Sequence, residues 1–547
     1  MTDSARPSDA ELPHDSASRN SPALPAGVEP DGIVPDDVIP HHNLPPLRWR
    51  DLPEPVSWKK MIGPSIMLAG LSLGSGEFIL WPHIVYKSGF VFFWACLIGV
   101  VTQFFLNMEI ERWTLATGES ATTGFCRLSR NWAWVMLIFN IVPWAWPGWA
   151  TGAAQILSWL MFGPVVTTLE NGDVTYGAHA VPWLGIGGLL LVGIVLTTGP
   201  VVYNTVERIQ TILVGLIVAL IAVLAVIVVR ADSVLALAGG ATGIGRMPDL
   251  AGTDLTYLSL LGALAFAGAG GSVNLGQSNF IKDKGYGMGR YIGRITSPLT
   301  GQEEAVSEVG YHFPHTPENA ARWRGWWRAA NIEHFLSFFL TCVVCLCLMS
   351  LISFSLFRTS NGFADPAGTL NEGMEQFGSG MNFVWGQATV LGTFTGGSVL
   401  KLMFLVTGVA ILLTTELGIL DATARISADL IKVNWLRDNA NWTLGRLYFF
   451  FLWGEILLGS AILLVGVFNP TFTEPQFLLV TSAAMNGGVM FIYSLILLYM
   501  NSKTLTRSLS LSPVRFLAIF WSAAFFGYFT LQALRLRILP WLMGDGG

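Results

Sequence analysis

A carboxylate preceded by two glycines lies in the middle of an apolar stretch, Met61–Lys87, that is long enough to cross a bilayer. Its centre reads Gly74-Ser75-Gly76-Glu77, about 20 Å from its start at a helical rise of about 1.5 Å per residue. Glycine and serine weaken a helix, and a charge at mid-membrane is costly unless it meets a cavity, a partner or an ion. We therefore expect a broken helix around a binding site. The alternative is a kinked helix whose Glu77 meets a polar neighbour.

A second run of small residues, Gly268-Ala269-Gly270-Gly271, interrupts the apolar span 255–281. Carbonyl oxygens freed at the two breaks would join the Glu77 carboxylate in a shell of hard oxygen ligands for a cation. Asn274 and Gln277 follow the second break, where they either line an inner path or satisfy freed backbone groups. The candidate substrate-binding residues are Gly74, Ser75, Gly76, Glu77, Phe266, Ala267, Gly268, Asn274 and Gln277, with Glu77 as the metal ligand.

Two further acids, Glu416 and Asp421, lie in the apolar span 401–431. They either hold a coupling ion or are buried acids paired with Arg425 or another base. The cysteines at 342, 345 and 347 have a spacing that could hold a metal, but we interpret them as small packing residues. The sequence shows no nucleophile–base set and no phosphate-binding loop, so we expect no catalytic residues, no cofactor and no enzyme activity.

The composition is that of a polytopic membrane protein. Of 547 residues, 52% are hydrophobic and 12% are charged, and the mean hydropathy is +0.54. The 21 Trp and 34 Phe suit lipid-facing and interfacial surfaces. No basic domain with interleaved aromatic residues occurs, so we expect the lipid bilayer and a transported solute as partners, and no nucleic acid.

The order of apolar and polar segments predicts an all-α protein of about eleven transmembrane helices. Residues 1–55 have little apolar periodicity, which predicts a disordered cytoplasmic tail. Pro143 and Pro147 interrupt the third helix, Asn486-Gly487-Gly488 suggests a break in the tenth, and residues 282–330 resemble a long polar loop. The tryptophans 144, 146 and 149 are interpreted as lipid-facing or interhelix aromatics rather than the wall of a pathway. The predicted helices are 61–85, 90–112, 132–160, 181–199, 207–229, 255–281, 331–357, 401–431, 446–468, 475–500 and 513–538.

The charges and the breaks together predict orientation and symmetry. Most of the 31 Lys and Arg fall in loops that are cytoplasmic when the N-terminus is inside, which places the C-terminus outside, in what we expect to be the plasma (inner) membrane. The two clearest breaks fall in helices 1 and 6, the first members of two five-helix sets. This is the signature of a LeuT-type 5+5 inverted repeat with a site at the midplane. We expect residues 56–505 to form a transporter core of helices 1–10, and residues 506–547 to add helix 11 and the C-terminal end.

The first helix resembles that of the Nramp divalent-metal transporters, which begins Gly-Pro and reaches a metal-binding motif Asp-Pro-Gly-Asn. Starting from Gly63-Pro64, an ungapped match places this motif on residues 74–77. Residues 111–119 are similar to the family's Arg-Leu-Gly-x-x-Thr-Gly stretch, and Cys126-Arg127 to the Cys-Arg that follows it. Helix 6 begins Leu261-Gly262-Ala263, as it does in the family.

The resemblance covers residues 61–280 and implies a secondary transporter of a divalent cation of the Mg, Mn or Fe class, working by alternating access. The motif's Asp is Gly74 and its Asn is Glu77, so one carboxylate remains, displaced by three residues. Phe266-Ala267-Gly268 replaces the family's Met-Pro-His, which removes the soft sulfur that favours transition metals over magnesium and calcium. Residues 141–151 lack the acids that the family ties to proton movement.

Two other functions compete with cation transport. Amino-acid transporters of the APC type also break helix 1 at Gly-Ser-Gly, where bare amides bind the substrate carboxylate, and their helix 6 is similar to Phe266 followed by glycines. Glu77 argues against this function because an acid there repels a carboxylate. A membrane enzyme or sensor is a more remote alternative, since it would need a second acid or a His beside Glu77.

Overall fold

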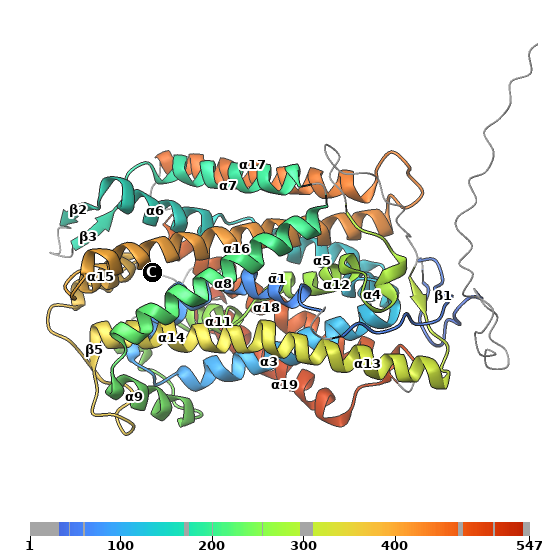
Figure 1. The fold of residues 1–547 in the computed structure, drawn as a ribbon, viewed down its shortest axis with the longest axis horizontal. Helices are drawn as coiled ribbons and strands as arrows, with labels where there is room; N and C mark the ends of the chain where they lie inside the picture. The colour runs from blue at the N-terminus through green and yellow to red at the C-terminus, as the bar shows by residue number, and fades with distance from the viewer. Residues whose placement is uncertain are drawn as a thin grey trace, which may run out of the picture.

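The structure, a computed structural model, describes residues 32–539 apart from 43, 58–60, 169–173, 200, 254, 296–309, 469–473 and 507–508. Long helices run side by side along the long axis of the molecule, and short strands and loops lie at its two ends (Figure 1). The predicted all-α, polytopic fold class is confirmed.

Eight continuous helical segments in the described part of the chain are long and apolar enough to cross a membrane. They are α3 (Phe93–Thr117), α7 (Val181–Thr198), α8 (Val202–Val228), the joined α13 (Pro317–His334), η6 (Phe335–Phe339) and α14 (Leu340–Phe357), α16 (Gly397–Asn434), α17 (Leu444–Phe468), α18 (Pro475–Lys503) and α19 (Pro513–Ala533).

Three further segments are interrupted, and they correspond to the predicted helices 1, 3 and 6. Together with the eight continuous segments they account for the predicted eleven. They are α1 (Pro64–Ser72), η3 (Gly76–Leu80) and α2 (Trp81–Ser88); α5 (Asn131–Ile141) and α6 (Gly148–Phe162); and α11 (Tyr257–Ala265), η4 (Gly271–Leu275) and α12 (Gly276–Lys284).

Short elements connect these helices at the ends of the molecule. They are β1 (Arg48–Trp49), α4 (Ala121–Leu128), β2 (Val165–Thr168), β3 (Val174–Gly177), α9 (Ala231–Thr242), α10 (Leu250–Thr253), η5 (Gly287–Tyr291), β4 (Tyr311–His312), β5 (Arg358–Thr359), β6 (Thr369–Leu370), η7 (Glu375–Phe377), α15 (Asn382–Leu391) and η10 (Leu534–Ile538). The strands form three two-stranded sheets, of which β1–β4 is parallel and β2–β3 and β5–β6 are antiparallel.

Proline and a capping side chain fix where several of the long helices begin. Thr316 accepts a hydrogen bond from the backbone N–H of Asn319, and Pro317 occupies the first turn of α13. Ser512 caps α19 in the same way, again with a proline, Pro513, directly after it. Both features favour a helix start, because a cap satisfies a free N–H and proline lacks one.

Two sequence predictions about helices are wrong. Asn486, Gly487 and Gly488 do not break the tenth helix, since α18 continues through them. A Cβ atom added to Gly487 would lie 2.6 Å from Cδ1 of Leu261, so this small residue allows α11 to pack closely on α18. The polar loop predicted for residues 282–330 is also shorter than expected, because α13 begins within it and continues directly into the membrane helix.

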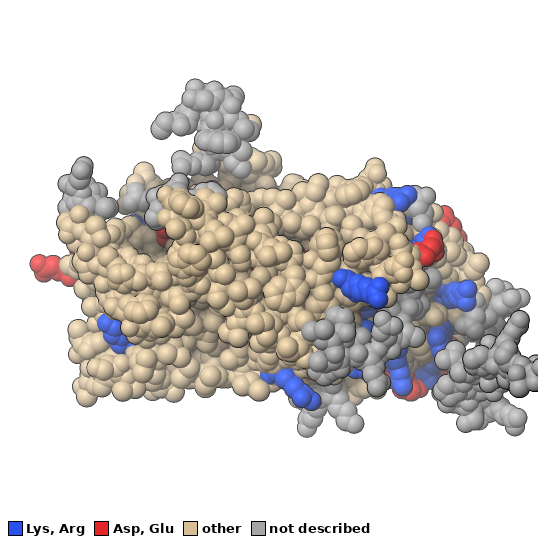
Figure 2. Space-filling model, turned by 90° about the horizontal axis from the view of Figure 1, so that it is seen from above, with Lys and Arg blue, Asp and Glu red and all other residues tan. Residues whose placement is uncertain are grey.

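Lys and Arg gather at the end of the molecule where β1 and α13 lie, while the flank along the helices is almost free of charge (Figure 2). A charge-free flank suits contact with lipid, and an excess of Lys and Arg at one end is typical of the cytoplasmic end of a membrane protein. Which end faces the cytoplasm stays a prediction from the sequence.

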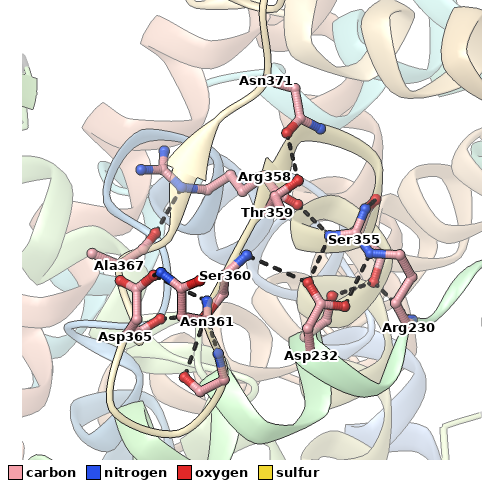
Figure 3. A network of polar contacts seen from close by, with 12 residues as sticks. Arg230, Asp232, Ser355, Arg358, Thr359, Ser360, Asn361, Asp365, Ala367 and Asn371 are labelled. Atoms are coloured by element: carbon pink, nitrogen blue, oxygen red, sulfur yellow. Dashed lines mark hydrogen bonds and ion pairs between the residues drawn. The ribbon is translucent and has the colours of Figure 1, made fainter.

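The opposite end is held by a polar network between α9 and the chain that follows α14 (Figure 3). Arg230 donates to both carboxylate oxygens of Asp232 at 3.0 Å and to the carbonyl oxygen of Arg358 at 2.5 Å. Asp232 also accepts from the backbone N–H of Ser360 at 3.4 Å. The hydrogen bond from Arg230 lowers the pKa of Asp232, so the network keeps its charge at neutral pH.

The prediction of a disordered tail over residues 1–55 is wrong for residues 32–55, while residues 1–31 lie outside the described residues. Residues 32–57, which we name the N-terminal strap, cross the Lys/Arg-rich end. Apolar side chains along the strap, among them Val34, Ile39 and Leu47, are fully buried. The strap is ordered because its apolar side chains are buried against other parts of the chain, and this burial offsets the entropy lost on ordering. The composition of the strap alone does not reveal that surface.

Backbone and side-chain contacts fix the strap to several helices. Its strand β1 pairs with β4, and the backbone N–H of Leu505, after α18, donates to Val38 at 3.1 Å. Arg127 of α4 donates to the carbonyl oxygen of Pro45 at 3.0 Å, and Trp326 of α13 donates to that of Pro53 at 2.8 Å. The strap therefore links α4, α13 and the end of α18.

A buried histidine lies under the strap. His312 in β4 stacks on Trp49 of the strap, with ring centroids 5.5 Å apart. Its Nδ1 donates to the carbonyl oxygen of Ala116 at 3.0 Å, and its Nε2 has no partner among the described residues. Burial lowers the pKa of His312 to about 4, so the docked strap favours the neutral ring.

Acid should release the strap. Burial depresses the pKa of His312 from an unfolded value of about 6.5 to about 4 in the folded protein. The stabilisation that the neutral ring gives to the docked strap is therefore complete above about pH 6.5, and it is lost as the pH falls towards 4. At pH 5 the loss amounts to about 2 kcal/mol. We expect hydrogen exchange in residues 32–57 to increase as the pH is lowered from 8 to 5, after correction for the intrinsic exchange rate.

The His312→Gln variant should show a much weaker pH dependence, because glutamine does not titrate. His315→Gln is the matched control, since His315 is an exposed histidine three residues further on, and it should keep the wild-type dependence. Equal pH dependence in wild type and His312→Gln would show that other groups control docking of the strap.

Candidate functional site

The breaks in helices 1 and 6 meet inside the molecule. A Cβ atom added to Gly76 would lie 1.7 Å from the carbonyl oxygen of Phe266, so the two backbones are in direct contact. Any other residue at position 76 would force them apart. The two breaks that the sequence predicts therefore share one location.

The break in helix 1 is stabilised by its own carboxylate and by α16. The helix α1 ends at Ser72, and the backbone N–H of Gly74 donates to Oε2 of Glu77 at 3.2 Å. Thr415 in α16 donates to the carbonyl oxygen of Leu73 at 3.1 Å. Backbone groups that leave the helical pattern in a membrane protein need such partners, and these side chains supply them.

The break in helix 6 is stabilised by a glutamine from α3. The helix α11 ends at Ala265, and the φ angles of Gly270 and Gly271 are 70° and 61°, a left-handed conformation that favours glycine. Gln103 donates to the carbonyl oxygen of Ala265 at 2.8 Å and accepts from the N–H of Gly270 at 3.3 Å. One side chain thus satisfies a freed acceptor and a freed donor.

A cavity of about 10 Å³ lies between the two breaks, which is room for about one water molecule or a bare ion. Its walls are Leu71, Ser72, Gly74, Ser75, Gly76, Trp144, Trp149, Phe266, Gly268, Ala269 and Thr415. Of the predicted substrate-binding residues, five are among these walls: Gly74, Ser75, Gly76, Phe266 and Gly268. The other four are not: Glu77, Ala267, Asn274 and Gln277.

Three aromatic rings form one wall of this cavity. Trp144 stacks on Phe266 with ring centroids 5.6 Å apart and an interplanar angle of 16°, and Trp149 lies 5.7 Å from the same ring. The indole N–H of Trp144 donates to Oγ of Ser272 at 2.9 Å. These two tryptophans are therefore interhelix aromatics rather than lipid-facing ones, and they also line the cavity.

Glu77 lies beside the cavity with unused hydrogen-bonding capacity. Its side chain is 1% exposed, and its Oε1 has no partner among the described residues. The hydroxyl of Ser75, in the cavity wall, is likewise without a partner there. A buried carboxylate oxygen with no protein donor is costly and suits a cation ligand. The carbonyl oxygen of Gly74, which we expected to be free, accepts from the N–H of Phe78 at 3.0 Å.

Asn274 and Gln277 lie after the second break, on the side that leads towards the Lys/Arg-rich end of the molecule. Asn274 donates to the hydroxyl of Tyr493 at 3.1 Å, and Gln277 donates to Oγ of Ser65 at 3.3 Å. Both are fully buried, and each keeps one amide oxygen without a partner among the described residues. Their contacts are with side chains below the breaks rather than with the freed backbone groups.

Ser65 leads to a cluster that the sequence did not suggest. It donates to the carboxylate of Glu333, which also accepts from the backbone N–H groups of Ser65 and Gly63 at 3.3 and 3.4 Å. The hydroxyl of Ser65 lies 2.9 Å from Nδ1 of His334. Glu333 thus caps the start of α1 from α13, a contact between residues so distant in sequence that no local pattern reports it.

The two acids of α16 have different environments. Asp421 accepts from Nε of Arg425 at 2.9 Å and from the hydroxyl of Tyr448 at 2.7 Å, and Arg425 also pairs with Asp283 of α12. Glu416 has no such base, and its Oε2 has no partner among the described residues. The predicted pairing with Arg425 is therefore correct for Asp421 and wrong for Glu416.

The described residues contain no group of three His, Cys, Asp or Glu side chains that could hold a metal. All five cysteines are free, and the Sγ of Cys342 lies 3.0 Å from Oγ of Ser72 in the cavity wall. A cation between the breaks would therefore meet one carboxylate, Glu77, together with hydroxyl and backbone oxygens. These are hard ligands, of the kind that magnesium, calcium and manganese accept.

Comparison with known proteins shows the fold. No family model and no curated protein matches the sequence. Among solved structures, the chain is similar to two mutants of the manganese transporter from Eremococcus coleocola, with TM-scores of 0.61 and 0.59 at 12% and 13% identity, and 90% of each chain covered. The same transporter in complex with an aromatic bis-isothiourea compound gives a TM-score of 0.58 at 12% identity, again over 90% of both chains. At this identity the likeness establishes a common fold: the chain is folded like this manganese transporter.

Proposed function

We propose that this protein is a secondary transporter that moves a divalent metal cation across the membrane by alternating access. The observation that carries the proposal is the meeting of two broken helices around a buried carboxylate, Glu77, whose Oε1 has no partner in the described part of the chain. Intramembrane acids at helix breaks are expensive and mark ion pathways. The fold is shared with a manganese transporter, which supports a cation as the substrate.

The family that we propose is a divergent branch related to the Nramp transporters. The similarity to a manganese transporter extends over 90% of the chain, and the sequence motifs at 63–64 and 74–77 fall on the broken helix 1. The ligands differ from those of the family, since Glu77 is the one carboxylate at the break and no sulfur stands at Phe266, Ala267 or Gly268. We therefore propose a cation of the Mg, Mn or Fe class.

Ion pairs at the inner end suggest which parts move. Arg425 of α16 pairs with both Asp421 and Asp283, and Lys282 of α12 donates to Asp429 of α16 at 2.7 Å. Removing one partner from a buried pair costs about 3–5 kcal/mol. We propose that these pairs hold α12 on α16 while the inner side is closed.

An amino acid is the second candidate substrate, because three aromatic rings and bare glycines line the cavity. Two features argue against it. The N–H of Gly74, which would bind a substrate carboxylate, already donates to Glu77. The cavity, about 10 Å³, is also much smaller than any amino acid. Uptake into vesicles containing the purified protein, measured for divalent metals and for amino acids, separates the two functions.

Replacing Glu77 by Gln should reduce metal uptake about tenfold or more, because losing a charged ligand costs more than about 1.4 kcal/mol. Folding should be preserved, since glutamine can still accept from the N–H of Gly74. The measurement is initial uptake of manganese into vesicles at equal amounts of inserted protein. Near-normal uptake by a well-inserted Gln variant would remove Glu77 from the pathway.

Glu455→Gln is the matched control. Glu455 is also an acid in a membrane helix, α17, where its Oε2 accepts from the hydroxyl of Thr423 at 2.5 Å. Its helix packs chiefly on α7 and α16 rather than on the broken helices 1 and 6, so its variant should transport far better than Glu77→Gln. Equal loss in both variants would show only that buried acids are needed for folding.

Selectivity provides a separate test of the ligand set. Hard oxygen ligands discriminate poorly between manganese and magnesium, so about a hundredfold excess of magnesium should reduce manganese uptake by about half or more. Excess cadmium, a softer ion, should compete less well than it does in a site with sulfur ligands. Strong inhibition by cadmium with none by magnesium would reveal a soft ligand.

Cys342 is the cysteine to test in that case, because its Sγ contacts Ser72 in the cavity wall. If the oxygen-only site is correct, Cys342→Ser should leave the magnesium-to-cadmium ratio of inhibition unchanged. A large fall in cadmium inhibition in this variant would place sulfur at the site.

A further inference from the structure

A cleft at the Lys/Arg-rich end has the properties of a binding site. It shares no lining residue with the cavity between the helix breaks. It lies between the end of α3, the start of α13 and the turn that precedes α19, and its volume is about 400 Å³. The residues that matter for its chemistry are Arg112, His315, Trp323, Arg324, Trp327 and Arg515. None of the residues in its wall is an acid.

The cleft carries uncompensated positive charge. Arg112 and Arg515 share one carboxylate, that of Glu109, at 2.8 and 3.0 Å. Arg324 is exposed, and the described residues supply it with no carboxylate. Three guanidinium groups therefore line the cleft, and the buried acids near them are Glu109 and Glu111, which also interacts with Arg515. The excess of positive groups attracts an anion.

The guanidinium groups are held in place before any ligand binds. The ring of Trp327 lies 4.3 Å from Cζ of Arg112 and 4.5 Å from Cζ of Arg515, measured to the ring centroid. Arg515 also donates to Asn331 at 2.6 Å, and Trp323 stacks on Trp327 with an interplanar angle of 11°. Fixed arginines bind a planar or tetrahedral oxyanion with a smaller loss of side-chain entropy.

The helix α19 adds two further features. Its N-terminus, capped by Ser512, lies in the wall of the cleft and contributes the positive end of a helix dipole. Directly along α19 from this point, Val514, Leu517 and Phe520 are 68%, 63% and 56% exposed. The positive cleft thus continues into an apolar surface of the kind that faces lipid.

We propose that this cleft binds the phosphate-bearing headgroup of an anionic phospholipid, with the acyl chains lying along α19. The ligand's two chemical parts match the two adjoining surfaces: a phosphate for the arginines, and hydrocarbon for the exposed apolar side chains. The bound headgroup would bridge α3, α13 and α19, and thereby stabilise the packing of the last helix on the rest of the protein. A free phosphate ion shares the headgroup chemistry but gains nothing from the apolar surface.

The test measures binding of phosphatidylglycerol to the purified full-length protein in detergent, by native mass spectrometry and by the shift in melting temperature. Phosphatidylglycerol should bind and raise the melting temperature, whereas phosphatidylcholine should not. Inorganic phosphate at the same concentration should have a much smaller effect. Equal stabilisation by inorganic phosphate would overturn the lipid assignment, and equal stabilisation by phosphatidylcholine would overturn the role of charge.

Variants locate the binding. Arg324→Gln changes an exposed side chain, so it should fold normally and bind phosphatidylglycerol about fivefold more weakly, the effect of one arginine near a membrane surface. Arg328→Gln is the matched control, because Arg328 is exposed on the same helix one turn further and does not line the cleft. Loss of affinity in both variants to the same degree would indicate general attraction rather than this site.

A second variant keeps all three arginines and adds one negative charge to the wall of the cleft. Ala320 lines the cleft and is half-buried, so Ala320→Glu should weaken binding of phosphatidylglycerol at least as much as Arg324→Gln does. Ala320→Gln, which adds the same bulk without charge, should bind more tightly than Ala320→Glu. Equal binding by these two variants would contradict the proposal.

Discussion

The direct contact between the backbones of Gly76 and Phe266 is the constraint on which the rest of the structure depends. Two helices that break at the same depth expose backbone groups where a membrane offers no water. Side chains from neighbouring helices answer this need: Gln103 from α3 holds the break in helix 6, and Thr415 from α16 holds the break in helix 1. The half-helices are thereby joined through side chains rather than through a continuous helix, which is a weaker and more adaptable connection.

Buried ion pairs gather where α12, the half-helix after the second break, packs on α16. Arg425 lies between Asp421 and Asp283, and Asp429 accepts from Lys282 and also from Ser120. If α12 moved away from α16, a fully buried guanidinium would lose a partner, at a cost that no single lipid contact offsets. Either these helices move together, or water must reach the pairs as they separate. In both cases the ion pairs oppose separation of α12 from α16.

The helix breaks could be predicted from the positions of glycine and proline, because these residues act on the backbone locally. The observed interruptions cover residues 73–75, 142–147 and 266–270, so each overlaps the place that the sequence predicts. The same rule failed at Gly487, where the missing side chain makes room for Leu261 instead of bending α18. The aromatic wall of the cavity was missed for a different reason. Trp144 and Trp149 lie on another helix, and only the packing of that helix brings them to Phe266.

The order of the N-terminal strap could not be predicted from local sequence either, because it too depends on contacts with distant residues. Its apolar residues are few and irregularly spaced, so its composition resembles that of a chain unable to offset its own ordering entropy. What offsets that entropy is a surface built from α4, α13 and the end of α18, to which Val34, Ile39 and Leu47 contribute fully buried side chains. The segment that looked least structured in the sequence is therefore ordered by contacts with residues far away in the chain, which no local pattern reports.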